Sequence, residues 1–210
     1  MTRSLVRPGA AAALVLAASA LALVPGRSRA AEGTAGLPPH STVVLAGGCY
    51  WGMESVFRHV RGVTTVTSGY ALPVQDSGAG SAAPAEAVRI VYDPARISFR
   101  RILDLFFSVA HDPTEVDRQG PDVGAEYRSI VFVEGDGQRS VVRSVVDSLT
   151  AAHTYPRPIA TQVASLQSFH VVDASQQDYA ARHPDDPYIV INDVPKIKAL
   201  RHRFPQFFRN

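Results

Sequence analysis

The 210-residue chain contains a single cysteine, Cys49, and this scarcity limits the chemistry that the protein can carry. With one thiol, no disulfide can form within the chain. The sequence also lacks the glycine-rich phosphate loop and the dinucleotide fingerprint of nucleotide-binding enzymes, and it shows no metal-binding cluster. No internal repeat or second domain boundary is visible. We therefore expect one domain without a metal or a bound cofactor.

The chain also lacks an apolar run long enough to stay in a membrane as a spanning helix. Its longest run, residues 10–24, has 15 residues, whereas a bilayer span needs ~20. Arg3 and Arg7 give this run a basic start, which is typical of a secretory signal. We therefore expect residues 1–30 to be a cleaved signal peptide of a secreted or periplasmic protein, with an uncleaved N-terminal anchor as the alternative.

Cleavage after Ala30 fits the small residues Ser28 and Ala30, which stand at the two positions that a signal peptidase reads. It leaves residues 31–40 as a flexible leader and residues 41–210 as one folded domain. The signal holds four of the 21 Lys and Arg residues and none of the 19 Asp and Glu residues, so 17 basic and 19 acidic residues remain. Because no basic stripe is left, nucleic acid is not an expected partner.

Hydrophobic periodicity predicts an α+β fold. The expected strands are residues 41–46, 63–70, 87–92, 127–133 and one or two segments within 161–171. The expected helices are residues 51–60, 137–152, 195–203 and one that Ser98 caps and that ends before His111. A small-residue loop is expected over residues 72–84. The repeated order strand, helix, strand predicts a ferredoxin-like split βαβ sandwich with additional C-terminal strand and helix segments.

Cys49 lies at the junction of the first expected strand and helix, between a glycine pair and the aromatic residues Tyr50 and Trp51. The first turn of a helix has free N–H groups and the positive end of the macrodipole, which favour a negative charge. We therefore expect a lowered thiol pKa and a reactive thiolate. A lone cysteine is more often a small buried hydrophobic residue, and that alternative stays open.

The segment GCYWG at residues 48–52 resembles the GCFWG signature of the A-type peptide methionine sulfoxide reductases, with tyrosine in place of phenylalanine. Three further stretches agree in order and spacing: AEAVRIVYDP at 85–94, HDPTEVDRQGPDVGAEYRS at 111–129 and PYIVINDVPK at 187–196. The resemblance covers nearly all of the chain from Thr42 onward. It implies a methionine sulfoxide reductase domain over residues 41–210.

Carried over position by position, the resemblance makes Cys49 the nucleophile that attacks the sulfoxide sulfur and Glu86 the acid that protonates its oxygen. A sulfoxide oxygen is a poor leaving group until it is protonated, and a glutamic acid enclosed by aromatic rings stays protonated near neutral pH. Attack gives methionine and a Cys49 sulfenic acid. Because the chain has no second cysteine, we expect an external thiol, such as a thioredoxin-like protein or dithiothreitol, to reduce it.

The resemblance also implies that Tyr50 and Trp51 line a pocket for the substrate methyl group, and that Asp122 and Tyr127 supply hydrogen-bonding groups. Each residue has a plainer alternative. Trp51 on the apolar side of a helix suits a core, Tyr127 suits strand packing and Asp122 suits a turn. Glu86 taken alone suits an exposed carboxylate at the start of a strand. The occurrence of all of them in the family order favours a site.

Some positions depart from the family pattern. Val74 stands where the family's longer loop carries a tyrosine that hydrogen-bonds the sulfoxide oxygen, and Pro84 and Gln176 replace histidines. The sequence leaves open whether Tyr70 or another hydroxyl supplies the missing donor. Two alternatives follow: a non-catalytic protein that binds methyl sulfoxides, or, less favoured, a cysteine hydrolase that pairs Cys49 with one of the seven histidines.

We expect a thiol-dependent oxidoreductase that converts methionine S-sulfoxide, free or in proteins and peptides, to methionine. Its role would be repair of exported proteins after oxidative stress, and the S stereochemistry is implied by the resemblance alone. We expect a monomer without a permanent membrane span.

Overall fold

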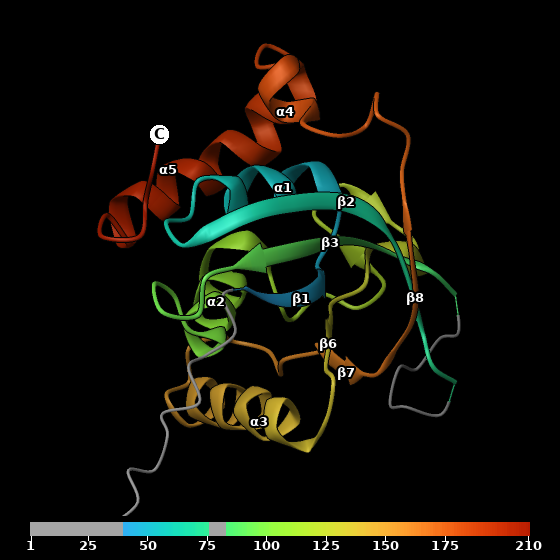
Figure 1. The fold of residues 1–210 in the computed structure, drawn as a ribbon, viewed down its shortest axis with the longest axis vertical. Coiled ribbons are helices and arrows are strands. Elements are labelled where there is room, and N and C mark those ends of the chain that lie inside the picture. Colours follow the sequence, from blue (N-terminus) through green and yellow to red (C-terminus); the bar gives the residue numbers. More distant parts are fainter. Residues whose placement is uncertain (1–39, 76–82) are drawn as a thin grey trace, which may run out of the picture. The chain divides into compact units, whose positions relative to one another are not determined.

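The computed structural model describes residues 40–75 and 83–210 (Figure 1). The expected signal peptide and all but the last residue of the expected leader lie outside the described residues. The strands are β1 (Ser41–Ala46), β2 (Val63–Pro73), β3 (Ala85–Tyr92), β4 (Arg118–Gln119), β5 (Asp122–Val123), β6 (Ile130–Phe132), β7 (Gln162–Ala164) and β8 (Leu166–Val171). The α-helices are α1 (Tyr50–Arg58), α2 (Phe99–Leu105), α3 (Asp136–Ala151), α4 (Tyr179–Arg182) and α5 (Val194–Arg203). Shorter helical turns are η1 (Phe106–Ala110), η2 (Ala125–Tyr127) and η3 (Ile189–Asp193).

Six strands form one mixed sheet in the order β7-β6-β1-β3-β2-β8, and β4 and β5 form a separate two-stranded hairpin. Neighbouring strands of the large sheet are antiparallel, except for the parallel pair β6 and β7. β3 lies between β1 and β2, although α1 connects β1 to β2 along the chain. The predicted α+β class is therefore confirmed, and β7, β8, α4 and α5 follow α3 along the chain.

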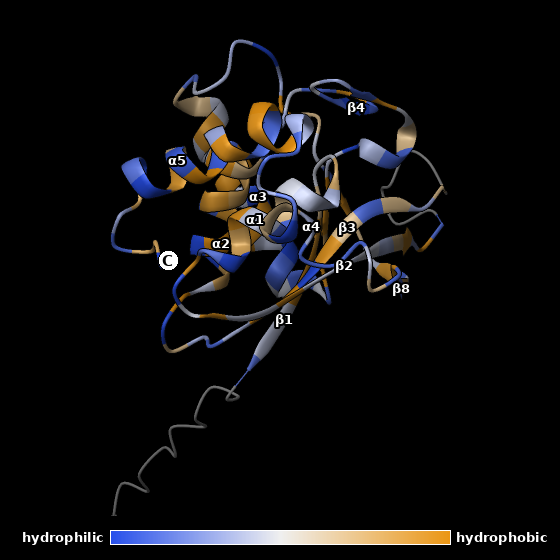
Figure 2. Cartoon of the chain, turned by 90° about the horizontal axis from the view of Figure 1, so that it is seen from above, coloured by the Kyte–Doolittle hydropathy of each residue, from blue (hydrophilic) through white to orange (hydrophobic). Residues whose placement is uncertain are grey.

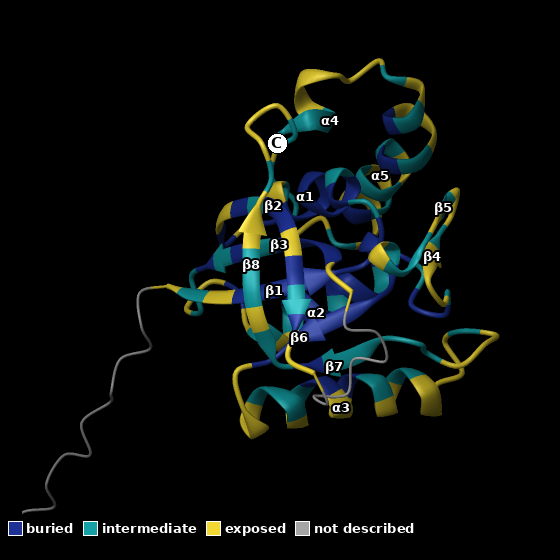
Figure 3. Cartoon of the chain, turned by 90° about the vertical axis from the view of Figure 1, so that its right-hand side faces the viewer, coloured by how far each residue is buried: buried dark blue, intermediate teal, exposed yellow. Residues whose placement is uncertain are grey.

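The strands bury side chains on both faces of the sheet. Val43 and Leu45 of β1 belong to the larger core, which includes residues of α1, α2, α3 and α5. The alternate residues Val44 and Ala46 belong to a smaller cluster, as the two-residue period of a strand requires. α1 and the central strands are largely buried, whereas α3 shows many exposed positions (Figure 3). Apolar stretches of the helices gather at the centre of the domain (Figure 2).

Several boundaries differ from the sequence-based expectation. β2 extends to Pro73 because its second half pairs with β8, which is about a hundred residues away in the chain. β3 begins at Ala85 rather than at residue 87, so Glu86 lies within the strand. The second helix ends at Leu105 and continues as the π-helical turn η1. Within the described residues, no helix combines the length and the hydropathy needed to cross a membrane.

The strand expected over residues 127–133 is wrong at its start. Tyr127 ends the 3-10 turn η2, and β6 begins only at Ile130. The buried side chain of Arg128 donates to the carbonyl of Ala125, so the chain here folds back on itself instead of extending. Tyr127 is therefore held in a turn rather than packed in a strand.

Candidate active site

Cys49 is the residue immediately before α1 and is partly buried. Two glycines make the junction between β1 and α1 possible. Gly48 has φ +92°, a conformation that glycine adopts without strain. A Cβ atom at Gly47 would lie 3.0 Å from the rings of both His111 and Phe106. The glycine pair therefore allows a sharp turn that presents Cys49 at the N-terminus of α1.

Glu86 reaches the same helix end from β3. Its carboxyl is buried, and its Oε2 atom accepts the backbone N–H of Tyr50 at 3.1 Å. The hydroxyl of Tyr70 donates to Oε1 at 3.4 Å, from the position directly opposite Glu86 in the register of β2 and β3. The alternative of an exposed strand-start carboxylate is therefore wrong. Burial raises the pKa of Glu86 to about 7, against the lowering effect of these two hydrogen bonds.

The thiol environment differs from the sequence-based expectation. Burial, followed by the charge of Glu86, raises the pKa of Cys49 to about 12. Hydrogen bonds with the backbone of Trp51 and the hydroxyl of Tyr188 act in the opposite direction but are outweighed. The expected lowering of the thiol pKa by the helix end is therefore wrong for the resting site. With a pKa this far above neutral, Cys49 rests as a thiol at neutral pH.

Aromatic rings surround the N-terminus of α1. The Tyr50 ring lies edge-to-face with Trp51 and Tyr70, at centroid distances of 6.2 and 6.0 Å. Trp51 stacks on Tyr179 at 3.8 Å and meets Tyr188 edge-to-face at 5.8 Å. Helix α1 and the C-terminal segment together therefore build an aromatic wall, which is suited to holding a methyl group by apolar and sulfur–aromatic contacts.

Asp122 lies in β5 and accepts a hydrogen bond from the hydroxyl of Tyr188. Burial raises the pKa of Tyr127 to about 12, with further contributions from the charges of Glu86, Asp122 and Cys49. The charge of Asp122 thus acts on Tyr127 and on Glu86 itself. Tyr188 was not predicted as a site residue, although it lies in the stretch at residues 187–196 that resembles the family, because no local sequence signal shows that it reaches back to Asp122.

The departures from the family pattern have distinct places in the structure. The side-chain oxygen of Gln176 accepts a long hydrogen bond, 3.5 Å, from the hydroxyl of Tyr50. Val74 follows β2, is 40% exposed and donates its backbone N–H to the carbonyl of Ser165. Its side chain carries no hydroxyl, whereas Tyr70, four positions earlier, reaches Glu86.

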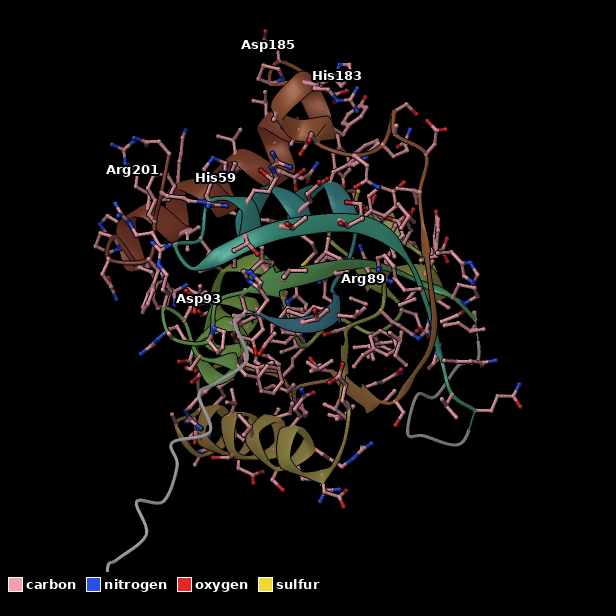
Figure 4. All side chains as sticks on the ribbon, in the orientation of Figure 1. His59, Arg89, Asp93, His183, Asp185 and Arg201 are labelled. Atoms are coloured by element: carbon pink, nitrogen blue, oxygen red, sulfur yellow. The ribbon has the colours of Figure 1, made fainter. Side chains whose placement is uncertain are left out.

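Within the described residues, the groups that act most on the pKa of Cys49 do not include a histidine. Among the described histidines, His111 is the one in the buried class, and its ring nitrogens bond to the carbonyl of Phe106 and the hydroxyl of Ser129. Burial also lowers its pKa to about 4. His183 lies exposed beyond α4, at the tip of the domain (Figure 4). In residues 40–75 and 83–210, no cluster of three or more His, Cys, Asp or Glu side chains is arranged to hold a metal ion.

The peptide methionine sulfoxide reductase family matches residues 41–207. The chain belongs to this family. It is 40% identical over 177 residues to peptide methionine sulfoxide reductase MsrA 2 of Mesorhizobium japonicum, an alignment that covers 81% of this chain and 91% of that protein. It is 38% identical over 177 residues to the MsrA protein of Thermus thermophilus, covering 81% of this chain and 99% of that one.

Solved structures agree with this assignment. Reduced Mxr1 from Saccharomyces cerevisiae is similar with a TM-score of 0.62 at 26% identity, over 70% of this chain and 87% of that chain. Methionine sulfoxide reductase A of Corynebacterium diphtheriae is similar with a TM-score of 0.56 at 28% identity, over 71% and 77% of the two chains. The resemblance found in the sequence is confirmed, and the enzyme class is that of the peptide methionine sulfoxide reductases.

Proposed function

We propose that this reductase converts methionine S-sulfoxide, free or within proteins, to methionine by attack of Cys49 on the sulfoxide sulfur. Glu86 is the acid that protonates the sulfoxide oxygen. The observation that carries this assignment is a buried carboxyl, with a pKa of about 7, bonded to the backbone N–H of the residue that follows the thiol. A group with such a pKa can gain and lose a proton in each cycle at neutral pH.

Cys49 and Glu86 act as a coupled pair that shares one proton. The form with a thiol and a carboxylate converts, by internal proton transfer, into the form with a thiolate and a carboxylic acid. The thiolate then attacks the substrate sulfur while Glu86 gives its proton to the oxygen. A bond forms between the two sulfur atoms. The hydroxyl group then moves from the substrate sulfur to Sγ of Cys49 as that bond and the sulfur–oxygen bond of the substrate break, which leaves methionine and a Cys49 sulfenic acid. Cys49 is oxidised by two electrons, and the substrate sulfur is reduced by two.

An external thiol completes the cycle. The first thiol attacks the sulfenic acid, releasing water and leaving a mixed disulfide on Cys49, and a second thiol restores the Cys49 thiol and leaves as a disulfide. The single cysteine of the chain supports this route, because no internal disulfide can form. We propose a small thiol or a thioredoxin-like protein as the reductant. The features of residues 1–30 support a secreted or periplasmic place of action.

The asymmetry of the site supports a preference for one sulfoxide epimer. The aromatic wall of Tyr50 and Trp51 suits the methyl group, while Glu86 suits the oxygen and Cys49 the sulfur. A site that fixes the methyl group, the oxygen and the sulfur in this way distinguishes the two sulfoxide epimers. The choice of the S epimer follows the family resemblance. The strand order β6-β1-β3-β2 likewise supports classing the central unit as a ferredoxin-like split βαβ sandwich.

The deciding experiment measures methionine release from the separate S and R sulfoxides by residues 31–210 with excess dithiothreitol, beside the Cys49→Ser variant. We expect turnover of the S epimer only, abolished by the substitution. A folded protein that binds a methyl sulfoxide but releases no methionine would instead support the non-catalytic alternative. Acylation of Cys49 by an ester substrate would support the hydrolase alternative.

A further inference from the structure

Tyr70 occupies a position in the site that the established family assignment does not explain. Its backbone lies directly opposite Glu86 in the β2–β3 register, and on its other edge it pairs with His170 of β8. Its ring packs edge-to-face against Tyr50, and 37% of the residue remains exposed. The hydroxyl of Tyr70 is therefore held between the buried carboxyl and the solvent by strands paired on both sides.

The two oxygens of Glu86 have different kinds of partner. Oε2 accepts the backbone N–H of Tyr50, which is fixed by the start of α1 and can only donate. Oε1 accepts the hydroxyl of Tyr70, which can rotate and can either donate or accept. When Glu86 takes up a proton, Oε1 is therefore the oxygen whose partner can adjust to the change. The hydroxyl of Tyr70 is then free to turn toward a second acceptor.

We propose that Tyr70 is a catalytic hydroxyl of this reductase, which donates to Oε1 of Glu86 in the resting enzyme and to the sulfoxide oxygen once Glu86 holds the proton. This inference rests on the proposed function. Tyr70 keeps its own proton throughout, so the proton balance of the attack is unchanged. Its contribution is a second hydrogen bond to the oxygen, on which negative charge develops as the sulfur–oxygen bond breaks.

The Tyr50 hydroxyl does not bond Glu86. Tyr50 engages Glu86 through its backbone, and its hydroxyl has Gln176 and the oxygen of Tyr70 as acceptors. Burial, followed by the charge of Glu86, raises the pKa of Tyr70, so its hydroxyl stays protonated and able to donate at neutral pH. A hydroxyl that already bonds the acid needs only a rotation to meet an oxygen bound beside that acid.

The test is a single-turnover burst of methionine from S-sulfoxide in the absence of any thiol, which measures the attack step alone. We expect the wild-type enzyme to release up to one methionine per protein. Tyr70→Phe should reduce the rate constant by about ten- to a hundredfold without lowering the amplitude, as loss of a hydrogen bond to a charged group does. The attack rate is expected to rise with pH as Glu86 loses its proton, and this rise is the acidic limb of the pH profile. In Tyr70→Phe the acidic limb should lie at higher pH, because the Glu86 carboxylate has lost a hydrogen-bond donor.

Tyr92→Phe is the matched control, since Tyr92 lies at the other end of β3, opposite Val63. It should keep the wild-type rate and pH limb. A Tyr70→Phe enzyme with the wild-type rate, or with a slower rate but an unmoved limb, would overturn the proposal, the latter outcome indicating a structural role. No burst from the wild-type enzyme would instead overturn the proposed function, and this inference with it.

A second variant covers the case in which Tyr70→Phe does not fold. Incorporation of 3-fluorotyrosine at position 70 keeps the ring and the hydroxyl but makes the hydroxyl a stronger donor. The acidic limb should then move to lower pH, and an unmoved limb overturns the proposal.

Discussion

Glu54 and Glu86 are both buried against α1, Glu54 from within the helix and Glu86 from β3. Burial raises the pKa of both carboxyls. Glu54 accepts the hydroxyl of Ser68 at 2.9 Å and the backbone N–H of Asp178 at 3.0 Å. Its other oxygen lies 3.8 Å from the guanidinium of Arg58. Glu54 is thus held by a cation and ties α1 to β2 and to the C-terminal segment.

Glu86 has a different set of neighbours. Its hydrogen bonds come from a backbone N–H and a tyrosine hydroxyl, and the charges that act on it are those of Asp122 and Glu126, which raise its pKa further. Burial alone therefore does not distinguish Glu86, the proposed acid, from Glu54. A neighbouring cation stabilises the charged form of Glu54, whereas carboxylates near Glu86 favour its protonated form beside the thiol.

Replacing each glutamate by glutamine should separate the two residues most clearly in activity. Glu86→Gln removes the proton that the sulfoxide oxygen needs, so we expect the attack step to slow by about a hundred- to ten-thousandfold. Glu54→Gln should keep the attack rate within about threefold, because Glu54 bonds Ser68 and Asp178 and the proposed attack does not use it. The single-turnover methionine burst measures both variants. Equal losses would show that the two carboxyls act through stability and not through chemistry.

Glu86 should also make the stability of the fold depend on pH. The pKa of Glu86 rises from 4.5 to about 7 on folding, so the folded state holds a proton that the unfolded state has released. Stability from this group is full below pH 4.5 and is lost as the pH rises through about 7, by about 3 kcal/mol in total.

Glu86→Gln removes this loss. Relative to wild type, the variant should gain stability between pH 5 and pH 8, measured by urea unfolding at both values. Cys49→Ser serves as the control, since the thiol pKa of about 12 places its own titration above this window. If the stability of the wild type and that of Glu86→Gln rose equally with pH, the result would contradict a raised pKa at Glu86.

The rate profile gives a further test of the coupled pair. Loss of the first proton, near pH 7, produces the form in which Cys49 and Glu86 share one proton. The attack rate should therefore rise by about tenfold per pH unit below 7 and level off above it. In Glu86→Gln this rise around pH 7 should be absent. The attack rate should instead keep increasing as the pH approaches the thiol pKa of about 12. A wild-type rate that falls above pH 7 would mean that Glu86 acts as an acid independent of the thiol proton.

The sequence predicted the part of the site that lies along one segment. β1 has the expected bounds, and Cys49 stands at the expected junction, because alternation and paired glycines are local signals. The family motif also pointed to Glu86, which lies beside Tyr50 in the fold. Their catalytic roles stay predictions until the variants are measured.

The remaining features depend on contacts between distant segments. The pairing of Tyr70 with Glu86 follows from strand register, and the contact of Tyr188 with Asp122 follows from the return of the C-terminal segment to the β4–β5 hairpin. The thiol pKa was predicted in the wrong direction because the helix end is visible in the sequence, while desolvation and the charge of Glu86 arise only on folding.

The smallest expected effect is on the stability of Glu54→Gln. The glutamine oxygen can still accept from Ser68 and Asp178, but its amide group faces Arg58 in place of a carboxylate oxygen 3.8 Å away. We expect a loss of about 1 kcal/mol, which lowers Tm by about 2–4 °C in a domain of this size. Arg58 also pairs with Asp178, so Arg58→Gln carries a loss of its own, and the double variant Glu54→Gln with Arg58→Gln should lose less stability than the sum of the two single losses. Strict additivity of the two substitutions would show that the cation does not stabilise Glu54, and the contrast between the two glutamates would then rest on their hydrogen bonds alone.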